Sequence, residues 1–506
     1  MTNEPDHTRR LMIAGGALLL SQAAVPGRAQ DGGGAPRDDG SAGGGAGGGD
    51  SGGADVSPVT AALAGYVAAA ADRVLPAGVA ARTALHVLDT LAAMVSGSRL
   101  KPGEMAARWI DSLGGRPQAT VAGTAIVTSA VAAALANGMA AHADETDDSH
   151  LRGRFHPGCA VVPAALATAE LTGASGAELL RAVALGYDIG ARLVFALGFR
   201  GVYTERHSTH SLAATFGATA AAAALLRLTP EGVRHAFSFA AQQASGVPYW
   251  ERDREHVEKA FDFGGMGARN GVTAATMVAH GFTGVDDFLG GSKNLLTAIG
   301  GDAPQPRELV AELGSRFEIM NTSIKKWTVG SPLQAVLDAV AVLLEDADVR
   351  AGRIRRIVVD MPANRLHIVD NRSIPDICLQ HLVAMMIVDG GATFASIHDA
   401  GRMRDPRVLA VRARITAVAS EELASAVPAR QAIVTIETGD GRTLRHRTVE
   451  VRGTPGNPMT AGEVAAKALD LMAPVLGNDR AEAVIATVAG LDGPEPVSRL
   501  RPLLLA

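Results

Sequence analysis

Residues 129–158, SAVAAALANGMAAHADETDDSHLRGRFHPG, join an alanine-rich segment to the densest group of ionisable side chains in the chain. The first half, residues 129–142, has the apolar spacing of a helix, and its alanines favour that conformation because they lose no side-chain entropy on ordering. Residues 142–156 then carry four acids and three histidines, and a second apolar segment follows at residues 159–172. Packing alone does not explain such a polar run between two apolar helices. The stretch therefore predicts a helical core that holds a polar site.

The helical pattern continues on both sides of this stretch, over about residues 56–299. Apolar residues recur at intervals of three and four over residues 79–95, 176–195 and 211–226, and glycines and prolines separate the segments. The 506-residue chain is 47% hydrophobic but only 4% aromatic, a composition typical of closely packed, alanine-rich helices. We therefore expect a large all-helical domain at residues 56–318.

The pattern changes after residue 319. Four segments alternate or are rich in β-branched side chains, as strands are: residues 353–361, 412–418, 432–437 and 444–451. Helical stretches lie between the first two of them, and a last helical pair follows from residue 461. We expect a mainly α protein in which a smaller α+β domain at residues 319–458 is inserted. The helices at residues 459–506 are expected to return to the large all-helical domain.

The first 29 residues have the order of an export signal. Arg9 and Arg10 directly precede an uncharged stretch at residues 11–25, and residues 27–29 supply a small-x-small cleavage pattern. This order predicts a twin-arginine signal peptide at residues 1–29 and a periplasmic or secreted mature protein. A basic start to an ordinary helix of a cytoplasmic protein and an uncleaved membrane anchor are the alternatives. The apolar stretch is short for a bilayer span, so we expect no span in the mature form.

The linker composition, the net charge and the cysteine count limit which partners and which disulfides the chain can have. Residues 30–55 are mostly Gly, Ala, Ser and Asp, and they predict a flexible linker because such a segment buries nothing to offset its ordering entropy. The net charge of -5 and the lack of a basic run exclude nucleic acid as a partner. Two cysteines, Cys159 and Cys378, cannot build a disulfide framework, and we expect both to be buried as small apolar residues.

The acids and histidines after residue 141 support three interpretations. Imidazole and carboxylate groups bind divalent metals, and the candidate ligands are His142, Asp147, Asp148, His150 and His156. Their spacing matches no tight metal motif. The same groups suit the binding and protonation of an anionic substrate, and a solvated loop that caps a helix is the third interpretation.

Other segments favour the anionic substrate. His207 and His210 lie at the start of the predicted helix at residues 211–226, where free N–H groups and the helix dipole favour an anion and a neutral imidazole. Lys259 precedes a glycine-rich stretch, and Lys325 lies at the junction of the two predicted domains. Lysines repel a metal ion but bind carboxylates. The glycine-rich stretch has no GxGxxG pattern after a strand, which excludes a nucleotide site.

At these residues the chain resembles the MmgE/PrpD family, which includes 2-methylcitrate dehydratases, cis-aconitate decarboxylases and an iminodisuccinate epimerase. The family pattern N-G-x-x-x-H-x-x-D/E-x-D-D-T-H, followed by H-P, is matched over residues 137–157, with serine in place of the threonine. Residues 270–284 and 324–327 resemble two further family blocks, and the resemblance spans about residues 59–476. It implies a helical domain with an inserted α+β lid, a homodimer, no cofactor and a small polycarboxylate substrate.

The resemblance also implies which histidines line the pocket. By position, His156 and His207 match the family's pocket histidines. We expect these two to transfer the proton and Glu145 and Asp148 to orient them. One extra residue before Phe216-Gly217 leaves His210 as the alternative to His207.

The substrate-binding set follows from the same comparison. Lys259 and Lys325 match the two pocket lysines that hold carboxylates. Ser149 and His210 belong to the predicted pocket, as does His381, which stands on the predicted lid helix where citrate-type members often have a tyrosine. No residue is assigned to a metal.

Dehydration, decarboxylation and epimerisation all develop charge on a carbon next to a carboxylate, and a pocket of lysines and histidines stabilises that charge. We therefore expect a cofactor-free lyase that dehydrates or decarboxylates a small di- or tricarboxylate. An isomerase or epimerase of the same family is the first alternative. An exported organic-acid-binding protein and a metal-dependent hydrolase are the alternatives outside it.

Overall fold

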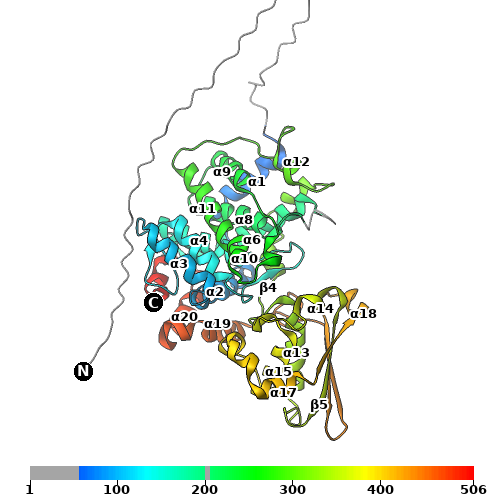
Figure 1. The fold of residues 1–506 in the computed structure, drawn as a ribbon. Coiled ribbons are helices and arrows are strands. Elements are labelled where there is room, and N and C mark those ends of the chain that lie inside the picture. Colours follow the sequence, from blue (N-terminus) through cyan, green and yellow to red (C-terminus); the bar gives the residue numbers. More distant parts are fainter. Residues whose placement is uncertain (1–55, 200–205) are drawn as a thin grey trace, which may run out of the picture. The chain divides into compact units, whose positions relative to one another are not determined.

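The computed structural model describes residues 56–199 and 206–506. The signal peptide and the linker predicted at residues 1–29 and 30–55 lie outside the described residues. The described chain is mainly helical and carries a four-stranded sheet in a smaller α+β domain (Figure 1). The predicted fold class is therefore confirmed.

The helical domain is built around long apolar helices. Its main helices are α1 (Pro58–Ala68), α2 (Ala77–Gly97), α3 (Lys101–Leu113), α4 (Ala130–Ala141), α5 (Gly158–Thr172), α6 (Gly176–Leu197), α8 (Thr209–Leu225), α9 (Pro230–Gln243) and α11 (Met266–Ala279). Side chains cap several of them: the Ser129 hydroxyl accepts a hydrogen bond from the Ala132 N–H at the start of α4. Ser175 and Glu178 form a reciprocal capping box at the start of α6. These caps satisfy N–H groups that the helices leave unpaired.

Glycines bring α4 against a π-helical turn at Phe261–Gly265. A Cβ atom added at Gly138 would lie 2.8 Å from the carbonyl carbon of Gly264, so neither position has room for a larger side chain. This close approach places His142, the residue after α4, against Phe263 of the turn. Small residues thus set the position of one site histidine.

The α+β domain has its own hydrophobic core. Its sheet has the order β6-β5-β7-β8, formed by β5 (Ile354–Pro362), β6 (Ile415–Ser420), β7 (Ala432–Thr438) and β8 (Thr443–Thr448). β5 runs parallel to β6, with Ile357 opposite Ile415, and antiparallel to β7. The helices α13 (Gln334–Leu343), α14 (Ala363–Val369), α15 (Leu379–Asp389) and α17 (Pro406–Arg412) complete the domain. Apolar residues from Val329 to Ile436 form this core.

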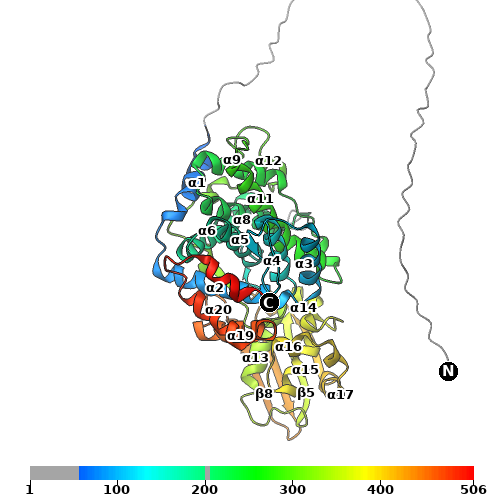
Figure 2. The same cartoon turned by 90° about the vertical axis from the view of Figure 1, so that its left-hand side faces the viewer.

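The C-terminal helices α19 (Ala461–Leu476) and α20 (Asn478–Ala489) pack with α2 in the core of the helical domain (Figure 2). By length and composition α2 is apolar enough to cross a membrane, but 72% of its most apolar window is buried in the fold. Such burial is typical of the core helix of a globular protein.

A short strand pair ties the polar run to the segment that carries Lys325. Strand β3 (Ser149–His150) is antiparallel to β4 (Thr322–Ser323), with His150 opposite Thr322. The polar run is thereby held beside a segment that is far from it in sequence. Strand β4 ends two positions before Lys325, so the pairing also brings Lys325 to the polar run.

Candidate active site

Four imidazole rings meet at the end of α4, and we call them the histidine cluster: His142, His156, His210 and His256. The ring centroid of His142 lies 5.0 Å from that of His156 and 5.2 Å from that of His256, and the centroids of His156 and His210 are 5.4 Å apart. Phe263 stacks on His142 and His210, with centroid separations of 4.4 and 3.5 Å. The rings come from the residue after α4, from the loop before α5, from α8 and from the residue before α10 (Val257–Ala260).

Asp147 holds two of these rings through its two carboxylate oxygens. Its Oδ2 lies 3.0 Å from His142 Nδ1, and its Oδ1 lies 3.0 Å from His156 Nδ1. Burial raises the pKa of Asp147, but the neighbouring His142 and His156 outweigh it and hold that pKa well below its usual range. Because an ionised carboxylate only accepts hydrogen bonds, each Nδ1 donates to it. Each Nε2 is then left as the basic nitrogen, and that of His142 is buried with no partner among the described residues.

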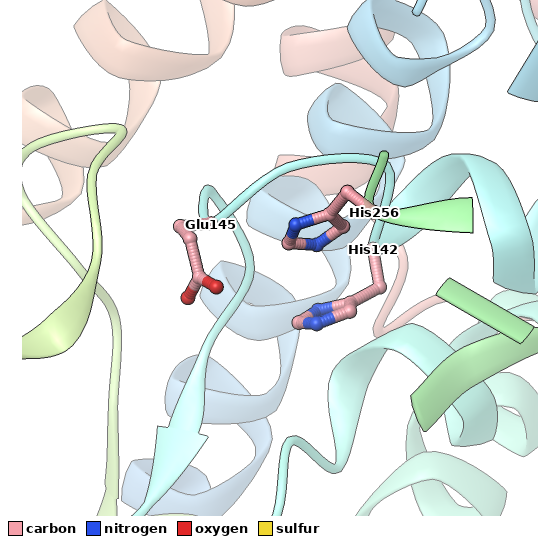
Figure 3. A group of neighbouring side chains, drawn as sticks. All are labelled: His142, Glu145 and His256. Atoms are coloured by element: carbon pink, nitrogen blue, oxygen red, sulfur yellow. The ribbon is translucent and has the colours of Figure 1, made fainter. Parts of the chain in front are cut away.

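Glu145 gathers two lysine side chains beside the cluster. Lys259 Nζ forms an ion pair with Glu145 Oε1, and Lys325 Nζ lies 3.6 Å from Oε2. Lys325 Nζ also donates to the Glu145 carbonyl oxygen at 2.8 Å and lies 3.7 Å from Asp147 Oδ1. Burial raises the pKa of Glu145, but the two ammonium groups hold it well below its usual range. Figure 3 shows Glu145 in the same neighbourhood as His142 and His256.

Three histidines of the cluster, His156, His210 and His256, are neutral at pH 7. Burial lowers the pKa of His156 to about 4 and that of His256 to about 3, and it lowers the pKa of His210 well below its ordinary value. Asp147 partly opposes the shift at His156, and the Lys259 ammonium adds to it at His256. The arrangement therefore offers neutral imidazole bases next to two ammonium groups.

A second network lies around Asp148 and is fully buried. Its Oδ2 lies 2.6 Å from His86 Nδ1 and accepts a hydrogen bond from the Tyr187 hydroxyl at 2.6 Å. Its Oδ1 accepts from the Gly158 N–H at 2.9 Å, at the start of α5. Asp148 therefore fixes α2, α5 and α6 to one another.

The comparisons with known proteins agree with this architecture. Residues 61–307 match the MmgE/PrpD N-terminal domain, and residues 327–492 match the MmgE/PrpD C-terminal domain. The chain belongs to the MmgE/PrpD family. The recognition made from the sequence is thereby confirmed.

Two relatives of this MmgE/PrpD chain are named as a cis-aconitate decarboxylase or as a protein like one. It is 29% identical over 326 residues to the cis-aconitate decarboxylase-like protein oryM of Aspergillus oryzae, which covers 60% of this chain and 66% of the relative. It is 24% identical over 444 residues to the cis-aconitate decarboxylase of Homo sapiens, over 84% of this chain and 89% of the relative.

The structure brings most of the predicted site residues of this MmgE/PrpD chain together. His156, His210, Glu145, Lys259 and Lys325 all belong to the cluster or to the lysine pair beside it. Ser149 is buried in β3, next to this region in sequence.

Three predicted residues lie elsewhere. His207 stacks on Phe199 with a centroid separation of 5.3 Å, and the structure brings His210 rather than His207 to the cluster. Asp148 contacts His86 instead of the cluster histidines. His381 is buried in α15, where burial and the charges of Arg412 and Arg402 lower its pKa to about 4.

Sequence reasoning did not assign Asp147 or His256 their places in the site. Asp147 stands beside Asp148 in the chain, and only the fold separates the histidines that each one contacts. His256 has a φ of 60°, a left-handed conformation that is rare for residues other than glycine and that clusters at functional sites. The sequence signal for His256 was its position three residues before Lys259.

The cluster also contains two groups whose donor atoms are close enough for a metal ion: His142, Glu145 and His256, and His142, Asp147 and Cys159, with each group's atoms within 4.8 Å of one another. Two imidazoles and a carboxylate are suitable ligands for several divalent ions. However, both oxygens of Glu145 already face lysine ammonium groups, which would repel a cation. The charge pattern fits an anionic ligand better than a metal.

Proposed function

We propose that this chain is a lyase that removes CO₂ or water from a small di- or tricarboxylate. The observation that carries the proposal is the Asp147 carboxylate, which holds the Nδ1 atoms of His142 and His156 next to the ammonium groups of Lys259 and Lys325. The names of the two relatives support decarboxylase chemistry on an organic acid.

The lysines bind and neutralise substrate carboxylates next to the reacting carbon. In a decarboxylation the bond to the departing CO₂ breaks, its electron pair delocalises into the adjacent unsaturated or carboxylate system, and a protonated imidazole then supplies a proton to that carbon. In a dehydration a neutral imidazole takes the proton next to a carboxylate, and the hydroxyl group leaves as water with a proton from a second imidazole that is protonated in the substrate complex. In both, stabilisation of the developing negative charge by fixed ammonium groups lowers the barrier.

The proton in either reaction is held by histidine. His156 Nε2 is the acid or base, because the His156 side chain is 11% exposed whereas that of His142 is fully buried. A bound polyanion raises the pKa of a nearby imidazole, so substrate binding moves His156 from about 4 toward the range that proton transfer requires. His210, the ring next to His156, is the second proton carrier.

The test is proton NMR of the purified protein in D₂O with a panel of di- and tricarboxylates, before and after exhaustive chelation. Loss of CO₂ or water from one acid supports the lyase. Deuterium exchange with inversion and no loss of mass assigns an epimerase instead. Thermal stabilisation by an acid without turnover assigns an organic-acid-binding protein, and activity that chelation abolishes assigns the metal-dependent hydrolase.

Export and assembly remain predictions. We propose that the twin-arginine signal at residues 1–29 directs the protein to the periplasm and that the mature chain is a homodimer. Cell fractionation with an Arg9→Lys/Arg10→Lys variant tests the first, because the variant would stay in the cytoplasm. Light scattering of the purified protein tests the second.

A further inference from the structure

The three tryptophans of the chain differ in what their indole N–H groups meet. Trp109 is 50% exposed on α3, and the Nε1–H of Trp327 donates to Asp338 Oδ1 at 2.9 Å. The Nε1 atom of Trp250, in contrast, is buried and has no hydrogen-bond partner among the described residues. An indole N–H only donates, and a buried donor without an acceptor is unfavourable. Trp250 therefore carries a donor that its protein surroundings do not use.

Trp250 lies against the histidine cluster. It belongs to η2 (Tyr249–Arg252), a short 3₁₀ turn between α9 and α10. The ring of Trp250 meets those of His210 and Phe263 edge-on, with centroid separations of 5.5 and 5.1 Å. Lys259 Nζ lies 5.7 Å from the centroid of the same ring. The unused N–H therefore belongs to a side chain of the candidate site.

Other ring nitrogens without a partner lie around Phe263 as well. Besides Trp250 Nε1 they are His142 Nε2, His210 Nδ1 and His256 Nε2, each buried without a hydrogen-bond partner in the described part of the chain. The His142 and His210 rings stack on Phe263, and the His256 ring lies beside that of His142. Folded proteins pair nearly all of their buried polar groups, so this concentration of unpaired nitrogens indicates that a polar ligand binds here.

The segment that carries Trp250 is fixed to the helix that carries Lys259. The Asp253 carboxylate accepts hydrogen bonds from the N–H groups of Glu255 and Lys259, both at 2.9 Å. The Asp253 N–H donates to the Trp250 carbonyl oxygen at 3.2 Å. The indole ring and the ammonium group are thus held on one local unit. A donor that is held in place before the ligand arrives binds it at a lower cost in ordering.

We propose that Trp250 is a substrate-binding residue whose indole N–H donates a hydrogen bond to a carboxylate oxygen of the substrate. This inference rests on the proposed function for the class of ligand. The N–H requires an acceptor, and the neighbouring Lys259 ammonium group favours an anionic one. Because Lys259 already forms an ion pair with Glu145, a neutral donor beside it adds a hydrogen bond to the substrate without adding charge to the site. Trp250 holds the substrate and does not transfer the proton.

The test uses protein labelled with ¹⁵N at tryptophan and two acids without a hydroxyl group or a double bond, propane-1,2,3-tricarboxylate and succinate. Calorimetry shows which of them binds more tightly, and the protein is saturated with that acid. The indole resonance of Trp250, assigned by elimination with Trp109→Phe and Trp327→Phe, is expected to move downfield as the hydrogen bond forms. The Trp109 resonance is the internal control and is expected to stay in place.

Trp250→Phe removes the N–H and keeps an aromatic ring. It is expected to bind the acid about tenfold more weakly, the effect of losing a hydrogen bond to a charged group. Its melting temperature without ligand is expected not to fall, because the substitution removes a buried donor that has no acceptor. Trp109→Phe is the matched control and is expected to bind the acid like the wild type.

A Trp250 resonance that does not move at saturation would overturn the inference, and so would equal affinity of Trp250→Phe and the wild type. Weaker binding together with a lower melting temperature would assign Trp250 a structural role instead. The resonance is measured on the wild type, so the test holds even where Trp250→Phe does not fold. Since only binding is measured, a failure of the lyase proposal in the turnover experiment would leave this inference intact. Turnover of an acid that leaves the Trp250 resonance in place would remove this inference alone.

Discussion

Three acids of one short run each contact histidine, but in different surroundings. Asp147 holds His142 and His156 next to two lysines, and His156 keeps part of its surface accessible. Asp148, the next residue, contacts His86 in a fully buried network that is completed by Tyr187 and a backbone N–H. Asp144 lies 2.8 Å from His398 of the α+β domain. The same pair of residue types therefore occurs in the proposed active site, in a buried packing network and in a contact between domains, and the neighbouring residues distinguish the three.

The largest expected effect is that of Asp147→Asn. The amide cannot keep both imidazoles with Nδ1 donating, so kcat is expected to fall by about 10³-fold or more. Steady-state kinetics on the acid found by NMR measure it. A loss of less than tenfold would mean that Asp147 does not set the state of the catalytic histidines.

Substitutions of single histidines test which imidazole rings transfer protons. His156→Gln is expected to reduce kcat by about 10²–10³-fold, and His210→Gln by about 10²-fold, because we propose that both rings move protons. His207→Gln is the matched control and is expected to stay within about twofold, since its ring stacks on Phe199. A larger loss of kcat in His207→Gln than in His210→Gln would contradict the placement of His210 in the histidine cluster.

Asp148→Asn is expected to act on stability instead. Its carboxylate is fully buried and fixes His86, Tyr187 and the start of α5, so the free energy of unfolding should fall by about 3 kcal/mol. Turnover of the folded fraction is expected to change by less than about threefold. Urea denaturation and kinetics at a temperature where the variant is folded measure the two quantities.

The smallest effect is a pH dependence from the Asp144 contact. Burial lowers the pKa of His398, but the Asp144 carboxylate outweighs it and raises that pKa to about 9. A histidine whose pKa is raised in the folded state adds stability that is complete below its unfolded value near 6.5 and is lost as the pH rises through 9. The free energy of unfolding is therefore expected to fall by about 1–3 kcal/mol between pH 6 and pH 9.5.

His398→Gln is expected to flatten that fall, and the exposed His280→Gln is the control that should leave it unchanged. Denaturation curves at several pH values supply the measurement. The same fall in His398→Gln as in the wild type would assign the pH dependence to other groups.

The fold class followed from the sequence because its signals are local. The alanine-rich segment at residues 129–142 became α4, and the alternating segment at residues 353–361 became β5 with a shift of one residue. The partners of the acids did not follow, because they depend on tertiary contacts. His86 lies 62 positions before Asp148 in the chain, and no spacing rule connects them.

The site shows the same limit. Lys259 and Lys325 were predicted from the motifs around them, and the structure places both on Glu145. The choice between His207 and His210 depends on how the chain enters α8, and only the fold decides it.

The most direct test of the account compares wild type, Asp147→Asn and Asp148→Asn by proton NMR in D₂O with the acid that the protein consumes, per mole of folded protein. The account predicts fast loss of CO₂ or water with wild type and Asp148→Asn, and about 10³-fold slower loss with Asp147→Asn. Equal rates for the two variants would contradict the assignment of proton transfer to the histidines that Asp147 holds.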